Sequence, residues 1–130
     1  DCHLELDKAV DAEFEKSQTP HVVLAEQIGR AIHEVSSRRS KFDVLFVYLP
    51  QRWTPGFKGG LQDDFDLHDF LKAKTAAMGI PLQLVREDKA VSYGCVASVM
   101  WRLGLAIYAK AGGVPWKLAE SDPETAYIGI

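Results

Sequence analysis

FDVLFVYL, residues 42–49, is a nearly continuous apolar run that ends at Pro50. Such a run, without alternation of polar and apolar side chains, is typical of a strand covered on both faces, as in a parallel sheet. Two further apolar stretches follow it along the chain, PLQLV at residues 81–85 and YIGI at residues 127–130. We interpret these stretches as a second and a third strand of the same sheet.

Two helices are predicted in the intervals between these strands. The first covers residues 67–78, where Asp66 can cap its beginning and Gly79 can end it. The second begins near Ser92 and ends around Lys110. Strands that alternate with helices form parallel sheets with right-handed crossovers. We therefore expect an α/β fold, a Rossmann-like parallel sheet with helices on both faces.

The segment before the first strand is predicted to be helical. Residues 23–38 carry apolar side chains at helical spacing, so one face of this helix is expected to pack inward. We assign residues 1–41 to an N-terminal helical segment that packs on the domain, and residues 42–125 to the domain itself. Residues 126–130 are assigned to the beginning of an adjoining domain that is truncated here, which suggests a fragment of a longer protein.

Length and composition limit the classes of protein to consider. The 130 residues suit one domain, and 47% hydrophobic and 25% charged residues are ordinary for a soluble globular protein. No apolar run is long enough to span a bilayer. Cys2 and Cys95 show no paired spacing, so neither a disulfide framework nor a zinc site is expected, and the cytoplasm is the expected location.

The net charge of −3 argues against a protein that coats a long nucleic acid, because such proteins are normally basic. Local binding of one end of a nucleic-acid strand remains compatible with this net charge. His68 and Lys72 offer the chemistry for it, since they are four residues apart on a predicted helix and share one face. An imidazole ring can stack on a base and an ammonium group can neutralise a phosphate, but the same pair could also be a solvated helix face.

Gln83 and Lys110 are the other polar candidates. Gln83 interrupts an apolar strand, and a buried amide needs hydrogen-bond partners, either in the protein or in a ligand. Lys110 closes the long helix, where a lysine can also offset the helix dipole. The end of that helix returns to the edge at which the preceding strand begins, so the two residues could be neighbours. Spacing alone does not bring His68 and Lys72 to them.

Residues 50–66 predict a loop at the end of the first strand, where parallel α/β sheets usually bind ligands. Arg52, Trp53 and Lys58 could there hold an anion or stack on a ring, although the nearby glycines match no dinucleotide or P-loop spacing. This loop supports an alternative function, a small α/β nucleotide-binding or enzyme domain. A second apolar stripe on the long helix, which includes Trp101, supports a third, a pure interaction domain.

In their order along the chain these pieces resemble the MID domain of the Argonaute (Piwi) family, in its prokaryotic branch. The matching pieces are a strand that ends in Tyr-Leu-Pro before a variable loop, a helix with His68 and Lys72, the run Gly79-Ile-Pro-Leu-Gln83, and a long helix that ends in Lys110-Ala-Gly-Gly113. Residues 127–130 resemble the first strand of the adjoining PIWI domain. The resemblance covers about residues 42–130.

The resemblance implies a binding domain without catalytic residues, which holds the 5′-terminal nucleotide of a small RNA or DNA guide. His68 would stack on the first base, and Lys72, Gln83 and Lys110 would contact the 5′ phosphate. The loop at residues 50–66 would influence which first base is preferred. The PIWI domain of the same protein would be a partner and would hold any nuclease site. A magnesium ion would bridge the phosphate and the C-terminal carboxylate of the full protein.

Two departures from the family pattern stand out. Many relatives have a tyrosine at the position of His68, although histidine occurs in a prokaryotic subset. Many also carry a second lysine one turn before Lys110, where this chain has Ala106. The resemblance therefore implies a pocket with one positive charge fewer than in those relatives.

Overall fold

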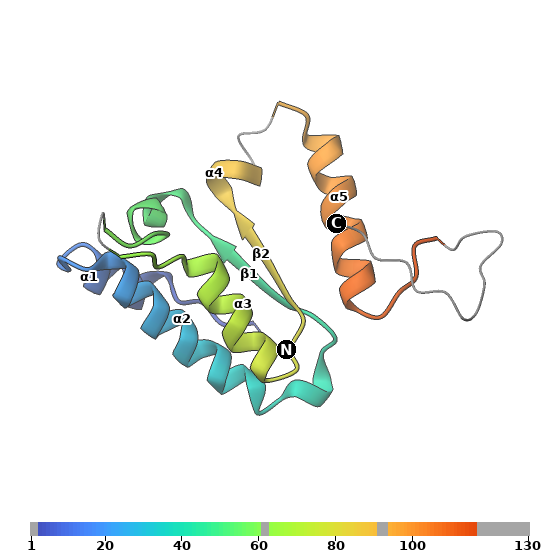
Figure 1. The fold of residues 1–130 in the computed structure, drawn as a ribbon, viewed down its shortest axis with the longest axis horizontal. Helices are drawn as coiled ribbons and strands as arrows, with labels where there is room; N and C mark the ends of the chain where they lie inside the picture. Colours follow the sequence, from blue (N-terminus) through green and yellow to red (C-terminus); the bar gives the residue numbers. More distant parts are fainter. Residues whose placement is uncertain (1–2, 61–62, 91–93, 117–130) are drawn as a thin grey trace.

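A computed structural model describes residues 3–60, 63–90 and 94–116 of the chain. The predicted third strand at residues 127–130, the segment 126–130 assigned to an adjoining domain, and Ser92 lie outside these ranges. The long helix expected to begin near Ser92 begins at Val96 and ends at Lys110, as predicted for its end. Within the described ranges the structure is a mixed α/β fold that is mostly helical (Figure 1).

The described elements follow one another in a simple order. They are α1 (Asp7–Phe14), α2 (Pro20–Ser36), the 3-10 helix η1 (Arg39–Lys41), β1 (Leu45–Leu49), the 3-10 helix η2 (Gln51–Gly56), α3 (Leu67–Ala77), β2 (Leu82–Arg86), α4 (Glu87–Ala90) and α5 (Val96–Lys110).

The two strands form a parallel pair, with Leu45 opposite Leu82 and Leu49 opposite Arg86, and α3 is the crossover between them. This confirms the predicted order of strand, helix and parallel strand. The described residues contain a sheet of two strands, so a larger Rossmann-like sheet remains a prediction.

Local sequence explains the bounds of α3. The Asp66 carboxylate accepts a hydrogen bond from the His68 backbone N–H, as an N-cap does. At the other end Gly79 has a φ of +64°, a left-handed conformation that favours glycine and ends a helix. Leu67, Leu71 and Thr75 form the buried face between these ends. Both predicted helix signals are confirmed.

The core lies between α2, α3 and one face of the sheet. Leu24 and Leu71 are fully buried there and Leu49 is almost so, and the N-terminal segment contributes Val10 to the same cluster. From the segment at residues 50–66, Trp53 also joins this core. That segment is therefore partly packed inside the fold, and is less of a loop than the sequence predicts.

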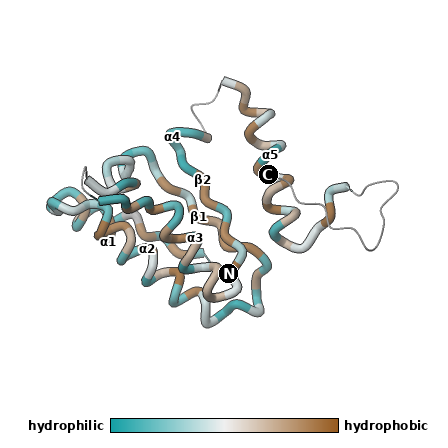
Figure 2. The backbone as a smooth tube through the Cα atoms, in the orientation of Figure 1, coloured by the Kyte–Doolittle hydropathy of each residue, from teal (hydrophilic) through white to brown (hydrophobic). Residues whose placement is uncertain are grey.

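The second face of the sheet is covered only in part. In Figure 1, α5 lies on the opposite side of the strands from α2 and α3, and it contacts β2. Phe46 and Tyr48 of β1 point to this side and remain 48% and 49% exposed. Figure 2 shows hydrophobic residues along both strands and α5, and Trp101 of α5 is also exposed. None of the described helices has the length and hydrophobicity that crossing a bilayer requires.

Candidate functional site

The outer edge of β2 carries the centre of the candidate site. Leu45 of β1 donates its backbone N–H to the carbonyl of Pro81 at 2.8 Å, so that carbonyl faces the neighbouring strand. Successive carbonyls in a strand point to opposite sides, which directs the Leu82 carbonyl away from β1. Lys110, the last residue of α5, donates a hydrogen bond of 2.6 Å from Nζ to this outward carbonyl.

Lys110 also contacts Gln83, as the topology predicts. Its ammonium donates to Gln83 Oε1 at 2.6 Å, while Gln83 Nε2 donates to the carbonyl of Leu84 at 2.9 Å. These bonds fix which end of the amide is oxygen and which is nitrogen. Since an ammonium group has three N–H donors, one donor of Lys110 is left beyond these two bonds. The two residues therefore form a fixed polar pair with remaining donor capacity.

Lys72 approaches this pair from α3. Burial of the Lys110 ammonium, and secondly the positive charge of Lys72, lower the pKa of Lys110 below its ordinary value of 10.5. The two positive charges are thus close enough to repel each other. Within the described residues, no carboxylate forms an ion pair with either lysine. The result is a pair of positive charges, from two separate helices, that no described carboxylate neutralises.

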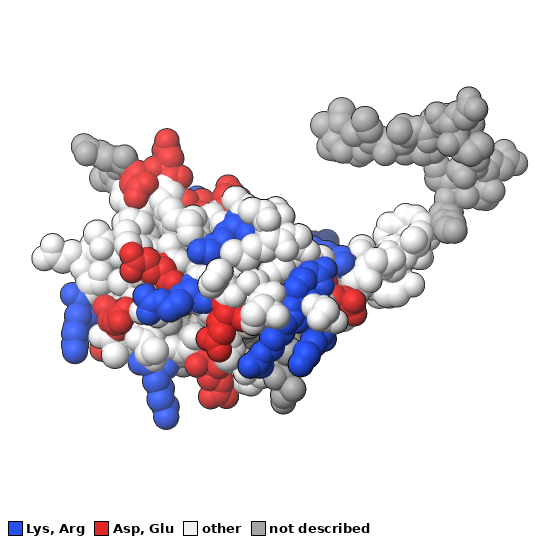
Figure 3. All heavy atoms as spheres, turned by 90° about the horizontal axis from the view of Figure 1, so that it is seen from below, with Lys and Arg blue, Asp and Glu red and all other residues white. Residues whose placement is uncertain are grey.

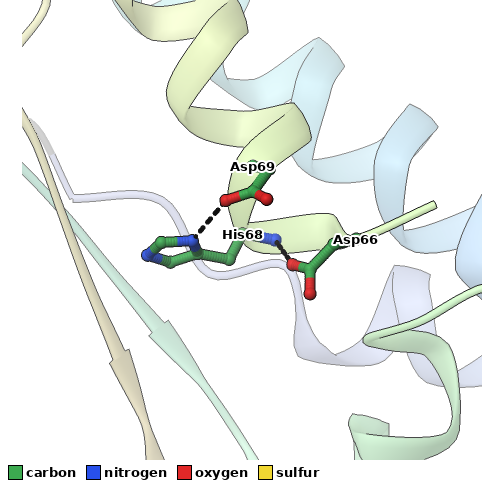
Figure 4. A group of neighbouring side chains, drawn as sticks. All are labelled: Asp66, His68 and Asp69. Carbon is green, nitrogen blue, oxygen red and sulfur yellow. Dashed lines mark hydrogen bonds and ion pairs between the residues drawn. The ribbon is translucent and has the colours of Figure 1, made fainter. Parts of the chain in front are cut away.

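His68 lies one turn before Lys72 on α3, and its ring is 46% exposed. The ring Nδ1 is 2.9 Å from Asp69 Oδ1, and Figure 4 shows the ring extending from α3 on the side of the strands. His68 and Gln83 line one cavity of about 450 Å³, together with side chains of α4 and α5. Tertiary packing thus places His68 near the pair that helix spacing alone could not reach.

The four predicted residues therefore surround one stretch of β2, but they are not all in contact. Lys72 lines a second, shallower hollow of about 390 Å³, whose wall includes Leu82. Gln83 and Lys110 bond directly, Lys72 acts on Lys110 through its charge, and His68 shares a cavity with Gln83. Elsewhere, acidic and basic side chains are mixed over the face in Figure 3, as expected for a net charge of −3.

At the rival site at residues 50–66, Arg52 and Trp53 are already bound to another part of the protein. Trp53 is 3% exposed, and its Nε1 donates to Asp11 Oδ1 at 2.6 Å. Arg52 donates from Nε to the same carboxylate at 3.0 Å. A ligand cannot stack on a buried indole, and the charge of Arg52 is already paired. Asp11 gave no signal in the sequence, because 41 residues separate it from Arg52.

Asp66, His68 and Asp69 place one potential metal-ligating atom each within 4.8 Å of the others. Asp66 already caps α3, and Asp69 contacts the His68 ring (Figure 4). Exposed groups of this kind are common without a metal, so we assign no metal site to it.

The magnesium ion implied by the family resemblance also lacks ligands beside Lys72 and Lys110. Magnesium binds carboxylate, phosphate and water oxygens, whereas the described neighbours there are two ammonium groups and one amide oxygen that is already hydrogen-bonded. The residues present do not fit the ion on their own.

A comparison of the chain with models of protein families finds no match, and a comparison with curated proteins finds none either.

Proposed function

We propose that this chain binds the 5′-phosphorylated end of a short RNA or DNA strand, as the guide-binding MID domain of an Argonaute-type protein. The observation that carries the proposal is the pair of un-neutralised positive charges on Lys72 and Lys110, next to the fixed amide of Gln83. Two neighbouring positive charges repel each other, and a chain with more acidic than basic residues could have paired them with carboxylates. An anion between the two helices would offset this repulsion.

A terminal phosphate suits this place better than other anions do. It carries a charge of about −1.5 to −2 near neutral pH and three strong acceptor oxygens, so it can offset the repulsion between the two ammonium groups. The remaining donor of Lys110 can bond one oxygen and Lys72 a second. An internal phosphodiester carries only one negative charge, so binding to these lysines favours the end of a strand over its middle.

The base of the same nucleotide would bind in the cavity lined by Gln83 and His68. The cavity next to Gln83 has apolar walls from β2 and α5, and His68 borders it with an exposed ring. Imidazole rings stack on bases without strong sequence preference. A ring for the base, two ammonium groups and an amide for the phosphate, and the order of the motifs along residues 42–130 all support the Argonaute proposal. The chemistry is binding only, and a PIWI domain would be the partner.

The experiment is a titration of two oligonucleotides that differ only in a 5′ phosphate or a 5′ hydroxyl. One charge-assisted contact contributes about 1.5–3 kcal/mol, so the phosphate should tighten binding by about 10- to 150-fold. Lys72→Gln should remove most of this preference, while Lys58→Gln, which removes an exposed charge from the rival loop, should preserve it. Equal affinity for both oligonucleotides would refute the proposal, and a preference that depends on Lys58 would favour the rival site.

A further inference from the structure

The cavity that Gln83 lines is also lined by basic residues, which the proposed 5′-phosphate contacts do not use. Arg86, Lys89 and Arg102 all line it, from β2, α4 and α5. Its walls between these cations are apolar, with Leu84 and Leu103 among them. Apolar walls with charges at the rim suit a ring inside the cavity and an anion at its mouth.

The three cations differ in what they already contact. Arg86 forms a bidentate pair with Asp88, with bonds of 3.0 and 2.6 Å, and its guanidinium lies 4.6 Å from the centre of the Phe57 ring. Lys89 and Arg102 form no ion pair or side-chain hydrogen bond with any described residue. Arg86 is therefore committed to the fold, and the positive charge of Lys89 already acts on the Asp88 carboxylate. The charge of Arg102 remains for a ligand.

Arg102 and Lys110 lie on the same side of α5, at different heights along the helix. Arg102, Ala106 and Lys110 recur at intervals of four residues, so they lie along one side of the helix. Arg102 and Lys110 are about 12 Å apart along its axis. The small side chain of Ala106 lies between them and lines the cavity. A ligand that contacts both cations must therefore extend along this side of α5, over the cavity that His68 also lines.

We infer that Arg102, assisted by Lys89, binds the second phosphate of the strand, the phosphodiester that links the first nucleotide to the next. This inference rests on the proposed function, because it takes Lys72 and Lys110 as the site of the first phosphate. The first nucleotide then occupies the cavity beside His68, and the backbone leaves it past Arg102. A guanidinium group is suited to this task, since its donors match two phosphate oxygens at once.

The test compares ligands of the 130-residue chain that differ by one phosphate. Thymidine 5′-monophosphate, its 5′-diphosphate and the 5′-phosphorylated thymidine dinucleotide are titrated by NMR at about 50 and about 200 mM salt, because salt screens a contact between two charges. The dinucleotide should bind more tightly than the monophosphate by about tenfold or more, and this difference should shrink at the higher salt concentration. Arg102→Gln should remove that difference and leave the monophosphate affinity unchanged, and Arg102→Lys should keep most of the difference.

The outcomes separate this inference from the proposed function. Arg30→Gln, which removes an exposed arginine from α2, is the matched control and should change neither ligand's affinity. The inference is overturned if Arg102→Gln weakens the monophosphate and the dinucleotide alike or weakens neither. It is also overturned if the 5′-diphosphate, rather than the dinucleotide, depends on Arg102. If thymidine without phosphate binds as well as the monophosphate, the proposed function itself fails.

Discussion

The ammonium group of Lys110 donates a hydrogen bond of 2.6 Å to the side-chain oxygen of Gln83, 27 residues earlier in the chain. A second bond of the same length holds the ammonium to the edge of β2, and the amide nitrogen of Gln83 is fixed by the Leu84 carbonyl. A flip of the amide would break both of its bonds. The positive charge is therefore held at one point of the sheet edge before a ligand arrives, which lowers the entropy cost of binding.

Changing Gln83 should separate its structural role from its role in binding. Gln83→Glu loses the hydrogen bond to the Leu84 carbonyl but gives Lys110 a charged acceptor in its place. The chain should therefore stay folded, while the added negative charge removes most of the preference for a 5′ phosphate. Gln83→Leu should instead lower the free energy of unfolding by about 1 kcal/mol, since Lys110 loses one acceptor. Urea unfolding and the paired oligonucleotide titration measure the two effects.

Gln18→Glu is the control for this pair, because it adds the same charge at an exposed residue far from β2 along the chain. If both glutamate variants reduce the phosphate preference equally, Gln83 has no local role and the effect is one of net charge.

Stability at alkaline pH should report the charge on Lys110. Its pKa is lowered in the folded protein, by burial and by Lys72. Between that lowered pKa and the ordinary value of 10.5, the unfolded chain binds more protons than the folded one. The contribution of Lys110 to the free energy of unfolding therefore rises with pH between these two values. Lys110→Met should remove the rise, Lys72→Gln should reduce it, and Lys58→Gln should leave it unchanged.

Urea unfolding at a series of alkaline pH values gives this comparison directly. The same slope in the wild type and in Lys110→Met would show that the Lys110 pKa is not lowered by the fold. A bound phosphate should oppose the effect, because it favours the charged form of the lysine.

Asp11 should stabilise the fold without contributing to binding. The pKa of its carboxyl is lowered below the ordinary 3.8, first by the hydrogen bond from Arg52 and then by that from Trp53. Its contribution is therefore present above pH 3.8 and lost as the pH falls through the lowered pKa. Asp11→Ala leaves a buried indole N–H without its partner, so near neutral pH it should cost about 1–3 kcal/mol.

The difference between Asp11→Ala and the wild type should shrink in strong acid, as measured by urea unfolding. Glu26→Ala on the exposed side of α2 is the control and should cost little. The phosphate preference of Asp11→Ala should equal that of the wild type. A loss of that preference in the folded variant would indicate that the phosphate binds at the rival site, residues 50–66.

His68 should affect the two oligonucleotides equally, because stacking involves the base and not the phosphate. His68→Ala should weaken both by a similar factor, equivalent to about 1–3 kcal/mol, and His68→Tyr should preserve or strengthen binding. The measurement is the paired titration, repeated with a ligand that has no base at its 5′ position. If that ligand loses as much affinity in His68→Ala as the others do, the ring contacts something other than the first base.

The sequence rules that succeeded are local or depend only on the order of elements. The Asp66 cap and the left-handed Gly79 follow from short-range backbone chemistry, and the Gln83–Lys110 contact follows from the return of the helix after β2 to the end at which that strand begins. The contact of Asp11 with Trp53 joins residues 42 apart, and no local pattern encodes it. The place of His68 on the cavity depends on how α3 and α5 pack beside β2, which helix periodicity does not determine.

The most direct test of the central claim is a double-mutant cycle between the lysine pair and the 5′ phosphate. The affinities of 5′-phosphate and 5′-hydroxyl oligonucleotides are measured for the wild type and for the variant with both Lys72→Gln and Lys110→Gln. If the two ammonium groups bind the phosphate, the wild type prefers the phosphate by about tenfold or more, and the double variant binds both ligands equally. A phosphate preference of the same size in the folded double variant would contradict the account.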